Sequence, residues 1–379
     1  MILTLAVLYL WILLPAGLLF RKGYRKVEGS YDFLILVPAH NEADGIARTV
    51  ASLKNLTLTG EVKITVIADN CTDNTADAAR ATGADVIERN NPDLRGKGYA
   101  LEYALKHNDL SRYNAVVIVD ADTIVAPNML EAMTRPLAAG AGAVQVSNEF
   151  LLDKKTPLEY LQQMANYAEN VFYYNARTVL GLPILLRGTG MAIASDVLLK
   201  HPWDSHSVTE DVDYAVNIIL DGYQIDFCLD TWVRSAATST YEQSYSQKSR
   251  WAGGTFGLIF GKGPQVLWKG VSRFRLGLVD LAWSFVTLSR PSLIFLCLIP
   301  LVLSILASPG NGILFALWSL ILIALLILYL IMGILFVQDK RASLKALLHA
   351  PFYGAWLFVV QLKALFRKNR DWVRTERKS

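Results

Sequence analysis

Two aspartates that are one residue apart, Asp120 and Asp122, have the side chains best suited to hold a divalent cation. They follow the apolar run Ala115 to Val119, which is typical of a buried strand, so we expect both carboxylates on the loop at its end. Carboxylate oxygens are the ligands that Mg²⁺ and Mn²⁺ prefer, and such ions often bridge to phosphates. Taken alone, the pair is equally typical of a solvated turn or of a cap for a helix after Pro127.

Asp69 and Lys97 accompany this acidic pair, and Lys97 has the chemistry to bind a diphosphate. Asp69 ends a second apolar run, Ile64 to Ala68, and Lys97 stands between two glycines. Glycines let the backbone approach a ligand closely, and a lysine there can pair with a diphosphate as a point charge. The alternative for Lys97 is an ordinary loop before a helix that begins at Tyr99.

A third acidic group, Thr209-Glu210-Asp211, opens a predicted helix whose apolar residues recur with helical spacing at Val212, Ala215, Val216 and Ile219. Ser207 with Glu210 predicts a capping box, and the helix dipole favours acidic residues at this end, so a structural role is sufficient for each residue in isolation. In a functional site, Asp211 would act as a general base, ionised at neutral pH and able to accept a proton from an acceptor hydroxyl.

The run Gln247-Lys248-Ser249-Arg250-Trp251 comes just before a glycine-containing apolar stretch. An arginine can clamp a diphosphate, and the face of a tryptophan can stack on a sugar ring. The alternative is an arginine and a tryptophan that anchor a helix at a membrane surface.

Apolar runs that alternate with amphipathic stretches predict the elements that position these residues. Phe33 to Val37, Ile64 to Ala68 and Val116 to Val119 are rich in valine and isoleucine, whereas Ile46 to Leu53 and Tyr99 to Leu105 have helical periodicity. This pattern predicts an α/β domain with a parallel sheet, whose ligands bind at the carboxyl ends of the strands. The polar residues cluster at those ends, and those after the first strand are Pro38, His40, Asn41 and Glu42.

The composition, 53% hydrophobic and 18% charged, predicts a membrane protein. Residues 1–20 carry no charge and are followed by four basic residues, which predicts a span with an outside N-terminus rather than a cleaved signal peptide. Residues 291–337 are also uncharged, and the turn-forming residues 308–312 divide them into two spans. Residues 350–366 have basic flanks on both sides, which favours an interfacial or re-entrant helix.

Several classes of function are disfavoured. The net charge of +4 comes mostly from the ends of apolar segments, so no nucleic-acid partner is expected. The three cysteines form no CxxC pair and no even disulfide framework, which fits a reducing, cytosolic environment. The five histidines lack metal-ligand spacing, so no zinc site is expected.

In chain order, Asp69, the Asp120 and Asp122 pair, Thr209-Glu210-Asp211 and Gln247 to Trp251 resemble the D, DxD, TED and QxxRW signature of family 2 glycosyltransferases. This is the pattern of cellulose, chitin, hyaluronan and poly-N-acetylglucosamine synthases, and it covers roughly residues 33–251. The resemblance implies an α/β fold: a GT-A (Rossmann-like) cytosolic domain with N- and C-terminal transmembrane helices and interfacial helices. The implied bounds are 1–22 for a transmembrane helix, 23–251 for the GT-A domain, 252–290 for interfacial helices, 291–337 for two transmembrane helices, and 338–379 for an interfacial or re-entrant helix and a basic cytosolic tail.

The resemblance also implies a role for each motif. The nucleotide sugar would contact Pro38, His40, Glu42, Asp69, Lys97, Asp120 and Arg250. The metal, Mg²⁺ or Mn²⁺, would be held by Asp122 with Asp120. Asp211 would be the base with Glu210 beside it, and the acceptor would contact Gly190, Gln247 and Trp251.

The implied function is inverting, metal-dependent transfer of a sugar from a UDP-sugar, with UDP-glucose or UDP-N-acetylglucosamine favoured, to a growing polysaccharide at the cytoplasmic face of the inner membrane. The alternatives are transfer of a single sugar to a lipid acceptor and a membrane scaffold with an inactive GT-A domain. A homo-oligomer or an export partner is left open. With about three spans and no regulatory domain expected after the basic tail, the chain departs from the large synthases.

Overall fold

The computed structural model describes residues 1–25, 27, 29–57, 60–287, 290–306 and 309–366. They form two compact units, each built from segments that are far apart in the sequence. The first unit contains Met1–Arg21, Leu152–Leu182 and Ala237–Ser379, of which the predicted basic tail at 367–379 lies outside the described residues. The second contains Lys22–Leu151 and Pro183–Ala236. The predicted GT-A domain, residues 23–251, is therefore divided between the two units.

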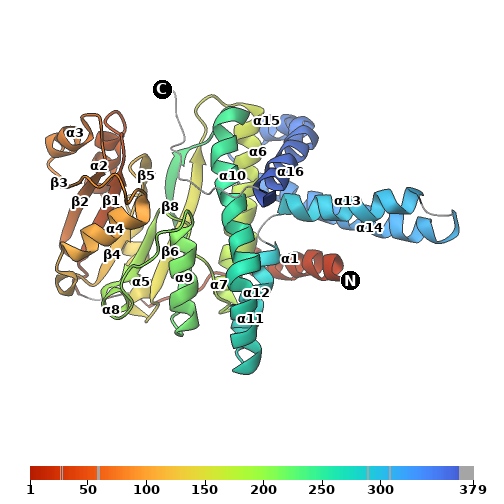
Figure 1. The fold of residues 1–379 in the computed structure, drawn as a ribbon, viewed down its shortest axis with the longest axis horizontal. Helices are drawn as coiled ribbons and strands as arrows, with labels where there is room; N and C mark the ends of the chain where they lie inside the picture. Colours follow the sequence, from red (N-terminus) through yellow and green to blue (C-terminus); the bar gives the residue numbers. More distant parts are fainter. Residues whose placement is uncertain (26, 28, 58–59, 288–289, 307–308, 367–379) are drawn as a thin grey trace. The chain divides into compact units, whose positions relative to one another are not determined.

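The second unit is built on one eight-stranded mixed sheet with the order β3-β2-β1-β4-β7-β6-β8-β5 (Figure 1). The first four strands are parallel, as predicted, whereas β7 runs antiparallel to β4 and to β6, and β5 runs antiparallel to β8. The strands are β1 (Phe33–Ala39), β2 (Val62–Asp69), β3 (Asp85–Arg89), β4 (Ala115–Ile118), β5 (Thr123–Val125), β6 (Ala143–Leu151), β7 (Met191–Ala194) and β8 (Ile225–Ala236). The parallel half brings the ends of β1, β2 and β4 to one edge of the sheet.

Amphipathic helices pack on this sheet. Ile46, Val50 and Leu53 of α2 are at most 1% exposed and join the core with Val37 of β1 and Val117 of β4. Burial of such side chains contributes about 1.5–3 kcal/mol each, so the sheet edge is rigidly supported. The helices of this unit are α2 (Ile46–Lys54), α3 (Thr75–Ala81), α4 (Lys97–Lys106), the short η1 (Leu110–Arg112), α5 (Met129–Ala138), α8 (Ser195–Lys200) and α9 (Glu210–Leu220).

The described part of the first unit is helical throughout its regular structure. In Figure 1, α13 and α14 lie side by side as a pair. The helices are α1 (Ile2–Leu19), α6 (Pro157–Glu169), the π-helical turn η2 (Asn170–Asn175), α7 (Ala176–Val179), α10 (Tyr241–Gly257), η3 (Leu258–Lys262), α11 (Gly263–Ser272), α12 (Leu276–Thr287), α13 (Arg290–Leu306), α14 (Pro309–Ile331), η4 (Met332–Phe336), α15 (Lys340–Ala346), η5 (Leu347–His349) and α16 (Ala350–Phe366).

A buried ion pair joins helices of the first unit that are distant in sequence. Nη2 of Arg177, which is 1% exposed, lies 2.5 Å from Oδ2 of Asp280, and the hydroxyl of Tyr9 donates to Oδ1 of Asp280 at 2.8 Å. Replacing either residue of this ion pair by an uncharged one would leave the other charge buried and uncompensated, which typically costs about 3–5 kcal/mol of stability. The pair therefore fixes α1 and α12 against α7.

Three segments among the described residues are long and apolar enough to cross a membrane: Ile2–Leu19, Gly312–Phe336 and Lys340–Phe366. The bent pair Leu276–Thr287 and Ser292–Ser304 would make a fourth if it forms one broken span. The predicted interfacial helix at 350–366 is the second part of Lys340–Phe366, and it is this longer segment that is long and apolar enough to span. The predicted turn at 308–312 is wrong from Pro309 onward, because α14 already begins there, and Ser308 lies outside the described residues.

Candidate active site

The carboxyl ends of the parallel strands bring a lysine and an aspartate into contact. Nζ of Lys97 lies 2.5 Å from Oδ1 of Asp120 and donates to the carbonyl oxygen of Gly188 at 2.7 Å. Lys97 is the first residue of α4, and Asp120 follows β4. The prediction of a loop with a helix from Tyr99 is wrong by two residues, and this early helix start places the ammonium group at the strand ends.

Asp211 reaches the same point from α9. A β-carbon placed on Gly188 would lie 3.4 Å from Oδ2 of Asp211 and 3.7 Å from Nζ of Lys97. Gly188 has a φ of +78°, a backbone conformation that favours glycine. A larger residue would crowd the space between the carboxylate and the ammonium group. Gly188, Lys97 and Asp211 therefore surround one small volume.

The loop Gly188-Thr189-Gly190 is joined by a hydrogen bond to the loop that contains Asp120. The backbone N–H of Asp120 donates to Oγ1 of Thr189 at 3.0 Å. Gly190 has different surroundings. A β-carbon there would lie 2.7–2.8 Å from the side chains of Val146 and Val233, inside the sheet core. In this loop, Gly188 faces Asp211 and Lys97, whereas Gly190 permits close packing in the sheet core, and its contact with the acceptor stays a prediction.

Burial and nearby charges give the carboxyl groups of Glu210 and Asp211 on α9 different pKa values. Burial raises the pKa of Asp211 to about 6, with Lys97 acting in the opposite direction. Burial and the Asp211 carboxylate together raise the pKa of Glu210 to about 8. Burial alone would lower the pKa of Lys97, but Asp120, Glu210 and Asp211 more than offset it and the pKa is raised. At neutral pH the site therefore holds a protonated Glu210, an ionised Asp211 and a charged Lys97.

The other predicted nucleotide contacts lie at the ends of β1 and β2. Asp69 is 6% exposed, and its Oδ1 lies 2.5 Å from Nη1 of Arg89. Nδ1 of His40 lies 2.8 Å from the carbonyl oxygen of Asp69. Pro38 is paired with Ile67 within the sheet. These loops hold one another in place.

Glu42 and Arg89 complete this side of the site. The backbone N–H of Glu42 donates to Oγ1 of Thr75 at 2.8 Å, which ties the loop after β1 to α3. Arg89 is absent from the predicted site because a single arginine at the end of a short strand has no local signature. Its guanidinium group neutralises the buried Asp69.

Two local predictions for the acidic motifs are wrong. Ser207 and Glu210 form no capping box: the N-cap of α9 is Thr209, and the Ser207 hydroxyl donates to Asp213 while accepting from the N–H of Thr209. Asp122 caps no helix, because the next element is β5. The hydroxyl of Thr123 donates to Oδ1 of Asp122 at 3.3 Å. The other structural alternatives are present: Asp122 lies in a turn in which the N–H of Thr123 donates to the carbonyl oxygen of Asp120 at 3.1 Å, and Glu210 and Asp211 lie in the first turn of α9.

The chemistry of the Asp120 and Asp122 loop fits a divalent cation that a ligand helps to hold. Within the residues that the structure describes, no group of three or more His, Cys, Asp or Glu side chains is arranged as a metal site. Mg²⁺ is commonly bound by only one or two carboxylates, with substrate phosphates and water completing its shell. Two adjacent carboxylates therefore suit a cation that arrives with a diphosphate.

Gln247, Arg250 and Trp251 lie on α10 and are described with the first unit. The Trp251 side chain is 48% exposed, and Nζ of Lys248 lies 4.2 Å from its ring centroid. At the start of the same helix, the Tyr241 ring contacts that of Trp356 of α16 at 5.1 Å between centroids. Lys248 thus lies over the half-exposed indole, and contact of Trp251 with the acceptor stays a prediction.

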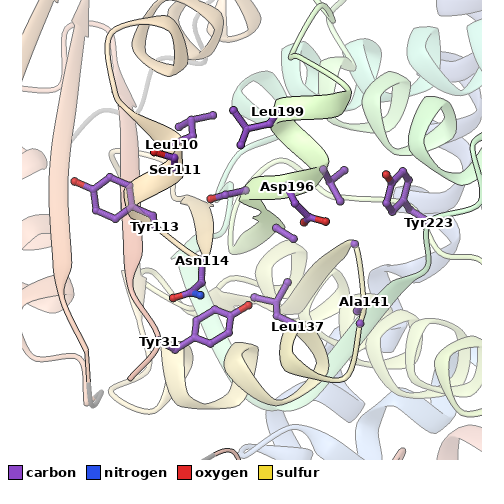
Figure 2. A pocket seen from close by; sticks show the side chains of 15 residues that line it. Tyr31, Leu110, Ser111, Tyr113, Asn114, Leu137, Ala141, Asp196, Leu199 and Tyr223 are labelled. Atoms are coloured by element: carbon purple, nitrogen blue, oxygen red, sulfur yellow. The ribbon is translucent and has the colours of Figure 1, made fainter. Parts of the chain in front are cut away.

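A pocket of about 520 Å³ lies elsewhere in the second unit (Figure 2). Tyr31 and Asn114, which line it, precede the amino ends of β1 and β4, whereas the residues described above follow the carboxyl ends. Asp196 and Tyr223 line it as well. None of the predicted site residues contributes to this pocket, so we do not assign the reaction to it.

A family model described as "Glycosyltransferase like family 2" matches residues 31–254, which contain all of the acidic motifs. The chain belongs to this family. The beta-monoglucosyldiacylglycerol synthase of Nostoc sp. is 29% identical over 246 residues, which cover 62% of this glycosyltransferase and 52% of that relative. The poly-beta-1,6-N-acetyl-D-glucosamine synthase of Staphylococcus aureus is 29% identical over 230 residues, 58% of this chain and 53% of the relative. This chain spans about half the length of the curated relatives it matches.

A solved mannosyltransferase from Pyrobaculum calidifontis, in complex with GDP-Man and Mn²⁺, superposes with a TM-score of 0.59 at 17% identity. The superposition covers 97% of this glycosyltransferase and 98% of that chain. At this identity the likeness shows the fold alone. It confirms the GT-A-like α/β fold that the motifs predicted.

Proposed function

We propose that this glycosyltransferase moves glucose or N-acetylglucosamine from its UDP-linked form to a hydroxyl group at the cytoplasmic face of a membrane, with inversion at the anomeric carbon and with a divalent cation. The convergence of Lys97, Asp120, Gly188 and Asp211 at the carboxyl ends of the strands carries this proposal. Ligands of α/β sheets bind at this edge. The family resemblance supports the choice of UDP and of the inverting outcome.

Asp211 is the proposed general base. Its carboxylate accepts the proton of the acceptor hydroxyl, the oxygen attacks the anomeric carbon, and the bond to UDP breaks with its electron pair leaving on the diphosphate. A pKa near 6 keeps Asp211 ionised at neutral pH yet basic enough to take the proton. Glu210, which stays protonated, adds no second negative charge beside the departing diphosphate.

The diphosphate side of the site is proposed to comprise Lys97, Asp120, Asp122 and, from the family motif, Arg250. Lys97 holds a full positive charge where the leaving diphosphate would gather negative charge. A divalent cation held by Asp120 and Asp122 would add Lewis-acid stabilisation of that leaving group. Asp69, fixed by Arg89, is proposed to contact the uracil ring with the help of the His40 loop.

The two named relatives support different acceptors. The Nostoc relative, by its name, forms a glucosyl diacylglycerol, which supports a lipid acceptor. The S. aureus relative, by its name, forms a polymer of N-acetylglucosamine, which supports a growing polysaccharide. A membrane location is supported by the apolar segments, which are long and apolar enough to cross a membrane.

The test uses the full chain in native-like membranes or nanodiscs with Mg²⁺ or Mn²⁺ and a panel of radiolabelled UDP-sugars. We expect turnover of UDP-glucose or UDP-N-acetylglucosamine, abolished by EDTA and restored by the cation. Organic extraction then separates a labelled glycolipid from a polymer, which is sized and digested with linkage-specific glycosidases. Absence of turnover with every UDP-sugar, while UDP still binds, would reject the proposed donor class.

A further inference from the structure

The segment Trp203 to Ser207, just before α9, packs directly on α4. A β-carbon placed on Gly98 would lie only 2.2 Å from the carbonyl oxygen of Ser205, so the two backbones touch with no room for a side chain. The indole N–H of Trp203 donates to that same carbonyl oxygen at 3.1 Å. The Trp203 ring in turn stacks on Tyr214 of α9, with 4.7 Å between centroids. This segment therefore links α9 to α4.

His206 makes the side-chain contacts of this link. Its ring stacks on Tyr99, with centroids 4.1 Å apart and planes 9° from parallel. Its Nε2 lies 2.6 Å from Oε2 of Glu102. Tyr99 and Glu102 are three residues apart in α4 and thus share one helix face. The imidazole ring is consequently held both on its face and at its edge.

The two linked helices begin with the reactive groups. Lys97 is the first residue of α4, and Asp211 is the second residue of α9. His206 precedes Asp211 by five residues and contacts α4 two and five residues beyond Lys97. A displacement of His206 from α4 would therefore move the base relative to the ammonium group. Errors of about 1 Å in such geometry can cost about 10²-fold in rate.

The same face of α4 also contacts the nucleotide side. The guanidinium carbon of Arg89 lies 5.9 Å from the centroid of the Tyr99 ring, and Nη1 of Arg89 holds Asp69 at 2.5 Å. A continuous row of contacts thus runs from Asp69 through Arg89 and Tyr99 to His206. Apart from Asp69, no residue of this row belongs to the family signature.

We propose that His206 is a positioning residue: through Tyr99 and Glu102 it holds the start of α9 on α4 and so sets Asp211 against Lys97. This inference rests on the proposed function for its kinetic consequence only. A purely structural contact on the surface would contribute stability without this effect, and the two roles make different predictions.

The experiment compares His206→Ala, Glu102→Ala and the double variant in the full chain. We expect each single variant to lower kcat about tenfold with UDP affinity and donor KM within about twofold of wild type, because only transition-state geometry is lost. The double variant should be no slower than the slower single variant, because both changes remove one contact. His206→Gln, which keeps an N–H donor, should recover part of kcat.

Lys106→Ala is the matched control. Nζ of Lys106 lies 2.5 Å from Oε1 of Glu102, whereas His206 contacts Oε2, so Lys106→Ala keeps the contact between Glu102 and His206. Its removal should leave kcat unchanged. Additive losses in the double variant, or an equal loss of kcat in Lys106→Ala, would overturn the inference.

Hydrogen–deuterium exchange provides a readout that needs no turnover. In His206→Ala the amides of residues 208–213 should exchange about tenfold faster, because the start of α9 loses its support, while Lys106→Ala should match wild type. Unchanged exchange in His206→Ala would reject the inference even if the donor is not a UDP-sugar. Conversely, faster exchange in a protein without UDP-sugar turnover would reject only the proposed function.

Discussion

Nζ of Lys97 lies 2.5 Å from Oδ1 of Asp120, which joins the first residue of a helix to the loop that follows the fourth strand. The contact gives the strand-end edge a cation that is present before any donor binds. It also occupies one of the two carboxylates proposed to hold a metal ion. If a metal diphosphate binds here as proposed, we expect Lys97 to pair with a phosphate in place of Asp120.

Replacement of Lys97 by methionine keeps the length of the side chain and removes its charge. We expect UDP affinity to fall about 10- to 100-fold, the loss typical of a hydrogen bond to a charged group. Because Lys97 lowers the pKa of Asp211, the acid limb of the pH profile should also move to higher pH. Titration of UDP and a pH series of kcat/KM test both effects. Lys106→Met is the control on the same helix. An acid limb that does not move would contradict the effect of Lys97 on the pKa of Asp211.

Asp211→Asn keeps the size of the side chain and the start of α9 but removes the proton acceptor. Turnover should fall by about 10² or more, with UDP affinity near normal. In the wild type, kcat/KM should rise with pH and level off above about 6, because the base acts in its ionised form, which predominates above the pKa of Asp211. Near-full activity of the variant would exclude Asp211 as the base.

Glu210→Gln should be mild at neutral pH because burial raises the pKa of Glu210 to about 8, so glutamine replaces a side chain that is already uncharged. We expect turnover at pH 7 within about threefold of wild type. The raised pKa means that the folded wild type binds a proton that the unfolded chain releases between pH 4.5 and 8, so wild-type stability falls with rising pH over that window. The variant should therefore gain thermal stability relative to wild type from pH 5 to pH 8. A difference in melting temperature between variant and wild type that does not change with pH would contradict the raised pKa of Glu210.

Asp122→Ala should remove the dependence of UDP binding on Mg²⁺ or Mn²⁺, because the diphosphate would lose its counter-cation. Titration of UDP with and without the cation measures this difference. Asp85→Ala, which removes a carboxylate at the opposite end of the sheet, is the control and should retain the dependence. If Asp122→Ala binds UDP with an unchanged metal dependence, the aspartate pair is only a turn.

Trp251→Ala tests whether the exposed indole of α10 acts on the acceptor. Stacking on a sugar or an acceptor head group would add orientation rather than charge stabilisation, so UDP affinity and slow hydrolysis of the donor should persist while transfer collapses. Trp268→Ala, which removes another exposed tryptophan of the same unit, is the control. Loss of folded yield with normal transfer per folded molecule would instead show a membrane anchor.

Local patterns were sufficient to predict the parallel half of the sheet. The runs Phe33 to Val37 and Ile64 to Ala68 lie within β1 and β2, and Ile46 to Leu53 lies within α2. A continuous apolar run such as Phe33 to Val37 reflects burial on both faces of the sheet, and the helical periodicity of α2 reflects burial on one face. The clustering of polar residues at the carboxyl ends followed from that topology. The family signature then made Asp120 and Asp211 candidates before any geometry was known.

The contacts that complete the site could not be predicted in the same way. Arg89 meets Asp69 across 20 residues, and His206 meets Glu102 across 104, so neither pair has a spacing that periodicity can detect. The capping box is absent at Ser207 because the N-cap of α9 is Thr209, and the Ser207 hydroxyl accepts from the N–H of Thr209 instead of that of Glu210. Pairings of this kind depend on the packed tertiary structure.

The contact of Tyr9 with Asp280 has a consequence for biosynthesis. The two residues are 271 positions apart, so the first helix leaves the ribosome long before its partner exists. At about 5–20 residues per second, the delay is on the order of tens of seconds. In the proposed membrane location, lipid or the insertion machinery would accommodate the nascent first helix during that interval, and the helical unit could close only after residue 280 has been synthesised. A chain that terminates before this point would retain the catalytic motifs but leave Arg177 without the carboxylate of Asp280.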